Sequence, residues 1–97
     1  MQEGGSIDLK MRVIRWAAKL RVNPKMVRVC PMRNKWGSCS SAGVITLAID
    51  LADREPAFRD FVIAHELLHL RYPHHSRLFK ATMSMHIPDW RELDARR

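Results

Sequence analysis

Hydrophobic residues in the first quarter of the chain recur at the spacing of one helix face. They lie three or four positions apart along the sequence and comprise Leu9, Val13, Trp16, Ala17 and Leu20. Ser6 or Asp8 offers a side chain of the kind that caps a helix N-terminus. Asn23-Pro24 supplies a stop, because the residue before a proline is excluded from helical backbone. The pattern therefore predicts a first helix that ends near residue 22.

Two short segments that follow are typical of β-strands. Met26–Cys30 alternates and carries β-branched residues, and 44–49 is a continuous apolar and β-branched run. Between them, Gly37-Ser38 and the segment 40–43 contain the residue types of turns. We expect the two strands to pair as an antiparallel hairpin with a long connection.

A second helical pattern begins at Pro56, since proline is favoured in the first turn of a helix. Apolar positions continue at helical spacing to about Arg71, where Tyr72-Pro73 forces the chain out of the helix. Ser76 is a suitable cap for a third helix over about 77–86. The sequence thus predicts a break between two helices.

These elements predict one α+β domain over residues 8–97, because a chain of 97 residues has room for one core. A small antiparallel sheet packs on the helix that starts at Pro56, with helices from both ends of the chain at its flanks. A short terminal turn is expected around Trp90, capped by Asp89. Residues 1–7 contain Gly4-Gly5-Ser6 and are expected to be disordered or tag-like.

The net charge is +7, from 17 lysines and arginines against 10 acidic residues. No run of five like charges occurs, so the charge favours a solvated basic surface over a nucleic-acid-binding tail. No apolar segment is long enough to span a membrane, and the N-terminus lacks the apolar core of a signal peptide. Cys30 and Cys39 form no CxxC pair, which favours a reduced, cytoplasmic protein.

The segment His65-Glu66-Leu67-Leu68-His69 has the form H-E-x-x-H inside the predicted second helix. Residues four apart lie on one helix face, so both imidazoles can bind one metal ion. The helix break then allows a third histidine to return to the site, and His74 and His75 compete for that place. Three imidazoles bind one Zn²⁺ per chain and leave a position for water, although other first-row metals also accept imidazole.

Glu66 lies next to the first ligand and can take a proton from the water. Two residues are weaker candidates for stabilising the transition state: the Tyr72 hydroxyl and His86. Trp36 can line a substrate cleft, although buried packing explains it as well. Val44 and Ile45 can bind a peptide as an added strand, although a core strand explains them as well.

Five short motifs follow one another along the chain. They are Trp36-Gly37-Ser38-Cys39-Ser40, Gly43-x-Ile45-x-Leu47, Val62-Ile63-x-His65-Glu66-Leu67-x-His69-Leu70, His75-Ser76-x-x-Phe79 and Pro88-Asp89-Trp90. This order resembles that of the YgjP-like metal-dependent hydrolases, zincin-like peptidases related to the SprT and WLM groups. The resemblance covers roughly residues 10–92 and implies a minimal catalytic core.

The resemblance implies a zincin-like fold in which His65, His69 and His75 bind the metal and Glu66 is the general base. It favours His75 over His74, because the third ligand of the family directly precedes the residue that matches Ser76. The expected function is zinc-dependent hydrolysis of peptide bonds in a peptide or protein substrate, by activated water and without a covalent intermediate.

Three other functions stay open at this point. Zinc can be structural in a nucleic-acid-associated domain, a reading that the charge of +7 motivates. A DNA-linked protease of the SprT type is intermediate between that domain and a peptidase. A domain that binds peptides without cleaving them is the third. No membrane partner is expected, and the pattern leaves the oligomeric state open.

Overall fold

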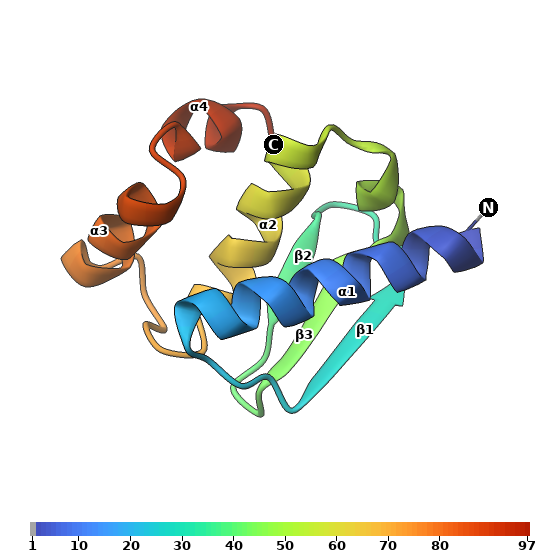
Figure 1. Cartoon of the computed structure of the whole chain (residues 1–97), viewed down its shortest axis with the longest axis horizontal. Coiled ribbons are helices and arrows are strands. Elements are labelled where there is room, and N and C mark those ends of the chain that lie inside the picture. The colour runs from blue at the N-terminus through green and yellow to red at the C-terminus, as the bar shows by residue number, and fades with distance from the viewer. Residues whose placement is uncertain (1) are drawn as a thin grey trace.

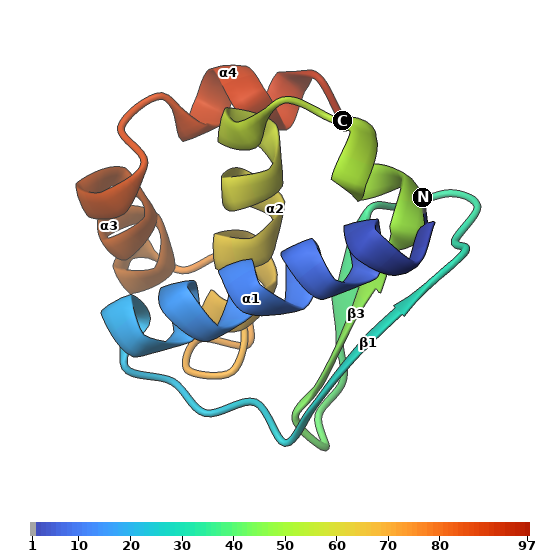
Figure 2. The ribbon, with the colours of Figure 1, turned by 45° about the vertical axis from the view of Figure 1, so that its right-hand side comes forward.

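The computed structural model describes the backbone of residues 2–97 and the side chains from residue 4 onward. A three-stranded sheet packs against helices that all lie on one of its sides (Figures 1 and 2). The elements in chain order are α1 (Gln2–Leu20), β1 (Met26–Cys30), β2 (Gly37–Cys39), β3 (Val44–Ala48), the 3-10 helix η1 (Ile49–Asp53), α2 (Pro56–Leu68), α3 (Arg77–His86) and α4 (Trp90–Ala95). The α+β class expected from the sequence is confirmed.

Helix α1 starts at Gln2, earlier than the predicted cap at Ser6 or Asp8. Its first turns pack on η1, so closely that a Cβ added to Gly5 would lie 3.0 Å from Cβ of Ala52. Residues 2–7 are therefore helical, in contrast to the expected disorder, and Met1 lies outside the described residues. Packing against η1 explains why this glycine-containing segment is helical despite its weak propensity.

The strand order is β1-β3-β2, with β1 parallel and β2 antiparallel to the central strand β3. The predicted antiparallel hairpin of β1 and β3 is therefore wrong. A tight turn after β2, closed by a 3.0 Å bond from Gly43 N–H to the Ser40 carbonyl, makes β2 the antiparallel neighbour of β3. Gly37-Ser38, expected to be a turn, belongs to that strand.

Helix α2 is the centre of the core, and every residue from Phe61 to Leu68 is buried. It packs on the buried face of the sheet, which Ile45 and Leu47 provide, and against α1. The contact with α1 includes a polar link, in which Asp60 accepts hydrogen bonds of 3.0 Å from both Arg12 and Trp16. Because α2 is held on several sides, the histidines it carries have fixed positions.

The helix break expected after α2 is present, and α3 begins after Ser76. The predicted cap is confirmed, since Ser76 Oγ accepts a 3.3 Å hydrogen bond from the Phe79 N–H. Helix α4 is longer than the predicted turn. Asp89 precedes it as expected, but the Asp89 side chain makes no capping hydrogen bond. Among the described residues, no helix combines the length and the apolar character that crossing a bilayer requires.

Candidate metal centre

Three histidine side chains converge on one point between α2 and α3. His65 lies in the last turn of α2, His69 is the C-cap of that helix, and His75 comes from the loop just before α3. The Nε2 atom of His75 lies 3.1 Å from Nε2 of His65 and 3.1 Å from Nε2 of His69. Ligands about 2.0–2.1 Å from a tetrahedral zinc ion are separated by about 3.3–3.4 Å, so this arrangement fits the ion closely.

The opposite ring nitrogens of two of these histidines face oxygen acceptors. Nδ1 of His65 lies 3.1 Å from Oε2 of Glu66, and Nδ1 of His69 lies 3.1 Å from the main-chain oxygen of Tyr72. An oxygen acceptor requires the proton to be on Nδ1, which leaves the Nε2 lone pair free for a metal. These contacts therefore fix both the tautomer and the ring orientation that a metal site needs.

The ring of Phe79 from α3 packs against all three imidazoles. Its centroid lies 4.7 Å from that of His75, 4.9 Å from that of His69 and 5.5 Å from that of His65. The phenylalanine is almost completely buried. It gives the histidines an apolar wall that restricts both their rotation and the access of water from that side.

His75 is the exposed member of the three, whereas His65 is buried. The pKa of His75 is lowered, first by desolvation and then by the neighbouring His65 and His69; Arg97 lowers it further and Asp94 raises it. A lowered pKa favours the neutral imidazole, which is the form that binds metal. The neighbouring His74 is exposed and is not part of the group that can hold an ion.

Glu66 is buried beside this group, with a side chain 4% exposed. It lies against β2, where a Cβ on Gly37 would come within 3.0 Å of Cγ of Glu66. Cys39 is also on β2. Its pKa is raised, first by burial and second by the charge of Glu66. The carboxylate therefore occupies a confined space between α2 and the edge strand of the sheet.

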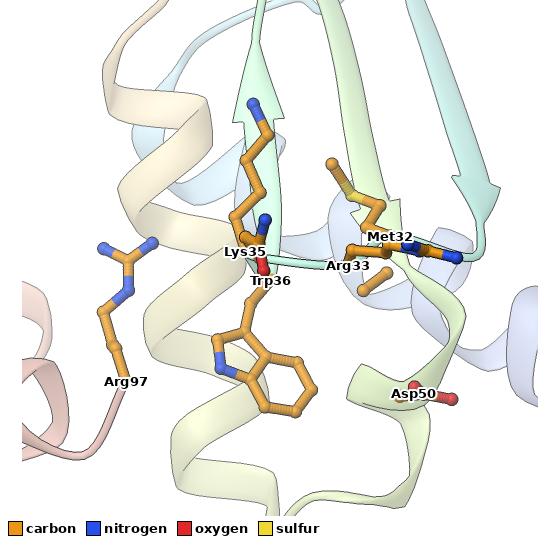
Figure 3. Close-up of a pocket in the computed structure, with 8 residues that line it drawn as sticks. Met32, Arg33, Lys35, Trp36, Asp50 and Arg97 are labelled. Carbon is orange, nitrogen blue, oxygen red and sulfur yellow. The ribbon is translucent and has the colours of Figure 1, made fainter.

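One cavity opens beside two of the histidines, and a second is linked to it through an ion pair. One of about 340 Å³ is lined by His65 and His75, together with Phe79, Lys80, Trp90, Arg91 and Asp94. The other, of about 300 Å³, lies around Trp36, before the start of β2 (Figure 3). An ion pair of 3.5 Å between Asp94 and Arg97 connects them, since Asp94 lines the first and Arg97 the second.

The weaker site candidates have different positions. Tyr72 is half-buried and approaches the site through its main-chain oxygen, which is bonded to His69. His86 packs edge-on against Trp16 at 6.1 Å and is not among the residues that line the cavity next to His65. Trp36 lines the second cavity, and its ring packs edge-on against Phe58 at 5.5 Å.

Val44 and Ile45 do not lie at an edge of the sheet. Their strand, β3, is hydrogen-bonded to a neighbour on each side, and Ile45 is fully buried. The reason for expecting them to bind a peptide by strand addition is therefore wrong. The strand with a free edge beside Glu66 is β2.

Three residues at the site were missed by sequence reasoning. Phe79 belongs to a motif with His75 but was given no role at the site, where its ring contacts that of His75. Gly37 was read as a turn residue, and Asp94 carries no sequence signal of its own. Their roles depend on how separate elements pack, which spacing along the chain does not reveal.

Comparison with known proteins agrees with this geometry. A family model described as "YgjP-like, metallopeptidase domain" matches residues 2–96. The metallopeptidase zymogen of Pyrococcus abyssi abylysin has a similar structure, with a TM-score of 0.80 at 22% identity over 91% of this chain and 90% of that one. The metallopeptidase zymogen of Methanocaldococcus jannaschii jannalysin gives 0.79 at 20% identity, over 92% and 86%.

No curated protein sequence matches the chain. At 22% and 20% sequence identity, the two solved structures show that this chain shares their fold. The family model, in contrast, spans almost the whole chain and all four residues of the centre, His65, Glu66, His69 and His75. The chain therefore belongs to the YgjP-like metallopeptidase domain family.

Proposed function

We propose that this protein is a zinc peptidase that cleaves peptide bonds with water and uses Glu66 as the general base. The observation that carries the proposal is the convergence of three Nε2 atoms, with separations of 3.1 Å from His75, beside a buried carboxylate. Three imidazole ligands leave one position of a tetrahedral site for water or substrate, the arrangement of catalytic rather than structural zinc.

Zinc bound at this site would supply Lewis acidity, which lowers the pKa of water and polarises a carbonyl group. The carboxylate of Glu66 would accept a proton from the attacking water and deliver it to the nitrogen of the leaving amine. Its contact with His65 keeps the carboxylate next to the ligand group.

The free edge of β2 is a suitable binding surface for a peptide main chain. Trp36 and Ser40 bond to β3, since the Trp36 carbonyl accepts from Ala48 at 2.9 Å and the Ser40 N–H donates to Val44 at 3.0 Å. In an antiparallel ladder, residues alternate in the direction of their polar groups. The main-chain N–H and C=O groups of Gly37 and Cys39 therefore point to the open edge, where an added strand can pair with them.

We infer a cytoplasmic location from the cysteines. Cys30 and Cys39 are both free thiols. Reduced cysteines without a disulfide are typical of a reducing compartment.

The test combines zinc content with cleavage of a peptide library by the parent protein and by Glu66→Gln. We expect about one zinc ion per chain in both proteins and a loss of about 10²–10⁴-fold in kcat for the variant, the usual contribution of a general base. Glu92→Gln, an exposed change on α4, is the matched control and should cleave like the parent. Equal cleavage by parent and Glu66→Gln would contradict the proposal, as would a parent that binds zinc and cleaves nothing.

A further inference from the structure

A cavity next to the start of β2 is lined by more basic than acidic side chains. The cavity around Trp36, of about 300 Å³, is lined by Arg33, Lys35 and Arg97 and by one carboxylate, that of Asp50. In Figure 3 the Trp36 ring lies between Arg97 and Asp50, and Lys35 extends alongside β2. We propose that this cavity binds the carboxylate side chain of an aspartate or glutamate in the substrate peptide and so selects acidic sequences.

The charges of the cavity are available for a ligand. Among the described residues, neither Arg33 nor Lys35 has a carboxylate within the 4.0 Å of an ion pair. Both side chains are exposed. Within the described part of the chain, Arg97 has one ion pair, of 3.5 Å with Asp94, which itself faces the other cavity, and its guanidinium also lies 5.9 Å from the centre of the Phe61 ring. One aspartate therefore leaves a surplus of positive charge that an anionic side chain can neutralise.

Trp36 gives the cavity an apolar surface, and Arg54, which is outside the lining and has Glu55 at 4.0 Å, stacks on its ring. The guanidinium of Arg54 lies 4.9 Å from the centre of the Trp36 ring and 4.0 Å from that of Phe58. This stacking covers one face of the indole and holds the arginine close to the cavity. The methylene groups of a glutamate can pack on the rest of the indole while its carboxylate faces the cations.

The position of the cavity places it along the path of a bound peptide. Lys35 and Trp36 directly precede Gly37, the β2 residue that lies against Glu66. Both residues belong to the connection that leads into β2 and not to the strand itself. A peptide paired with β2 and continuing past Gly37 would thus bring a side chain on one side of the scissile bond into the cavity.

This inference rests on the proposed peptidase function and is tested so that the two can fail separately. The zinc-loaded protein is given peptides that differ only by glutamate, glutamine or lysine at each of three positions on either side of the scissile bond. We expect glutamate to raise kcat/KM about tenfold over glutamine at one position, mainly through KM, the combined effect of several exposed ion pairs.

The variant Arg33→Glu/Lys35→Glu should lose this preference or reverse it toward lysine. Lys10→Glu/Arg15→Glu is the matched control, because it makes the same charge change at two exposed sites on α1 that do not line the cavity. An unchanged glutamate preference in the cavity variant would overturn the inference. Equal cleavage of all the parent's peptides would also overturn it and leave the peptidase function standing.

A binding assay covers the case in which no peptide is cleaved and the peptidase function itself fails. Fluorescence anisotropy of a labelled glutamate peptide is measured with zinc-loaded Glu66→Gln, with and without the double charge reversal. We expect the reversal to weaken binding about tenfold and the glutamine peptide to bind less tightly than the glutamate peptide. Equal binding of both peptides, or displacement by a single-stranded oligonucleotide at lower concentration than by the acidic peptide, would overturn the inference.

Discussion

Gly37 of β2 lies directly against Glu66 of α2, so closely that a Cβ on the glycine would come within 3.0 Å of Cγ of the glutamate. Leu47 and the Thr46 carbonyl would each be 3.3 Å from the same added atom. The absence of a side chain at Gly37 therefore gives the carboxylate its space. The strand with a free edge thus also sets where the Glu66 carboxylate can lie.

Gly37→Ala should lower kcat about tenfold or more and leave zinc content near one per chain, because it displaces Glu66 without touching a ligand. Overpacking of this kind also destabilises a fold, typically by about 1–3 kcal/mol. Steady-state kinetics, zinc analysis and thermal unfolding separate the two effects. Gly4→Ala, where an added Cβ meets nothing within 4 Å, is the control. Unchanged kcat in a folded Gly37→Ala protein would contradict this role for the glycine.

Replacing His75 and replacing His74 should have opposite consequences for metal binding, although the residues are adjacent. His75→Ala removes one of three converging ligands and should reduce zinc to a small fraction of one ion per chain. His74→Ala changes an exposed side chain outside the group and should leave the content unchanged. Zinc analysis after dialysis measures both. A chelator should lower the Tm of the parent and of His74→Ala, since a bound ion stabilises the folded state.

Cys39 should react more slowly with iodoacetamide than Cys30 in metal-free protein at about pH 8.5, near the ordinary thiol pKa. Burial and the charge of Glu66 raise the pKa of Cys39, so it keeps its proton to a higher pH and less reactive thiolate is present. Glu66→Gln removes the second cause and should accelerate labelling of Cys39 alone. Mass spectrometry of labelled peptides gives both rates, and equal acceleration at Cys30 would show a general loosening instead.

Asp60→Ala should destabilise the fold more than the loss of an exposed ion pair does. Asp60 accepts bonds of 3.0 Å from Arg12 and from the indole of Trp16, which is 9% exposed. Leaving these donors without a partner costs about 1–3 kcal/mol in the free energy of unfolding. Urea titration measures this change in the free energy of unfolding. Asp8→Ala, which breaks half-exposed contacts with Arg12 and Arg59, should cost at most about 1 kcal/mol.

The helices were predicted well because local signals define them. Pro56 opens α2, Ser76 caps α3 and apolar spacing marks the buried face of α1. The start of α1 was missed because contact with η1, and not local propensity, holds its first turns. Sheet pairing was missed for a related reason. Gly37–Cys39 is too short and too polar to show strand alternation, and its pairing with β3 leaves β1 parallel.

The clustering of the histidines was predictable because two of them are spaced by the period of a helix. His65 and His69 need no knowledge of the fold to be placed together. The third histidine could not be placed without the fold, since spacing alone did not decide between His74 and His75. Before the structure, only the family resemblance favoured His75. The groups around the ligands come from β2, α3 and α4, and their approach is a property of tertiary packing.

The three ligands differ in what holds them, and this difference bears on how quickly a cation can enter or leave. His65 and His69 are fixed to a helix buried in the core, whereas His75 sits on an exposed loop. Detaching His75 opens the coordination sphere without unwinding α2. Exchange of the ion should therefore follow the opening rate of that short loop and be much faster than global unfolding.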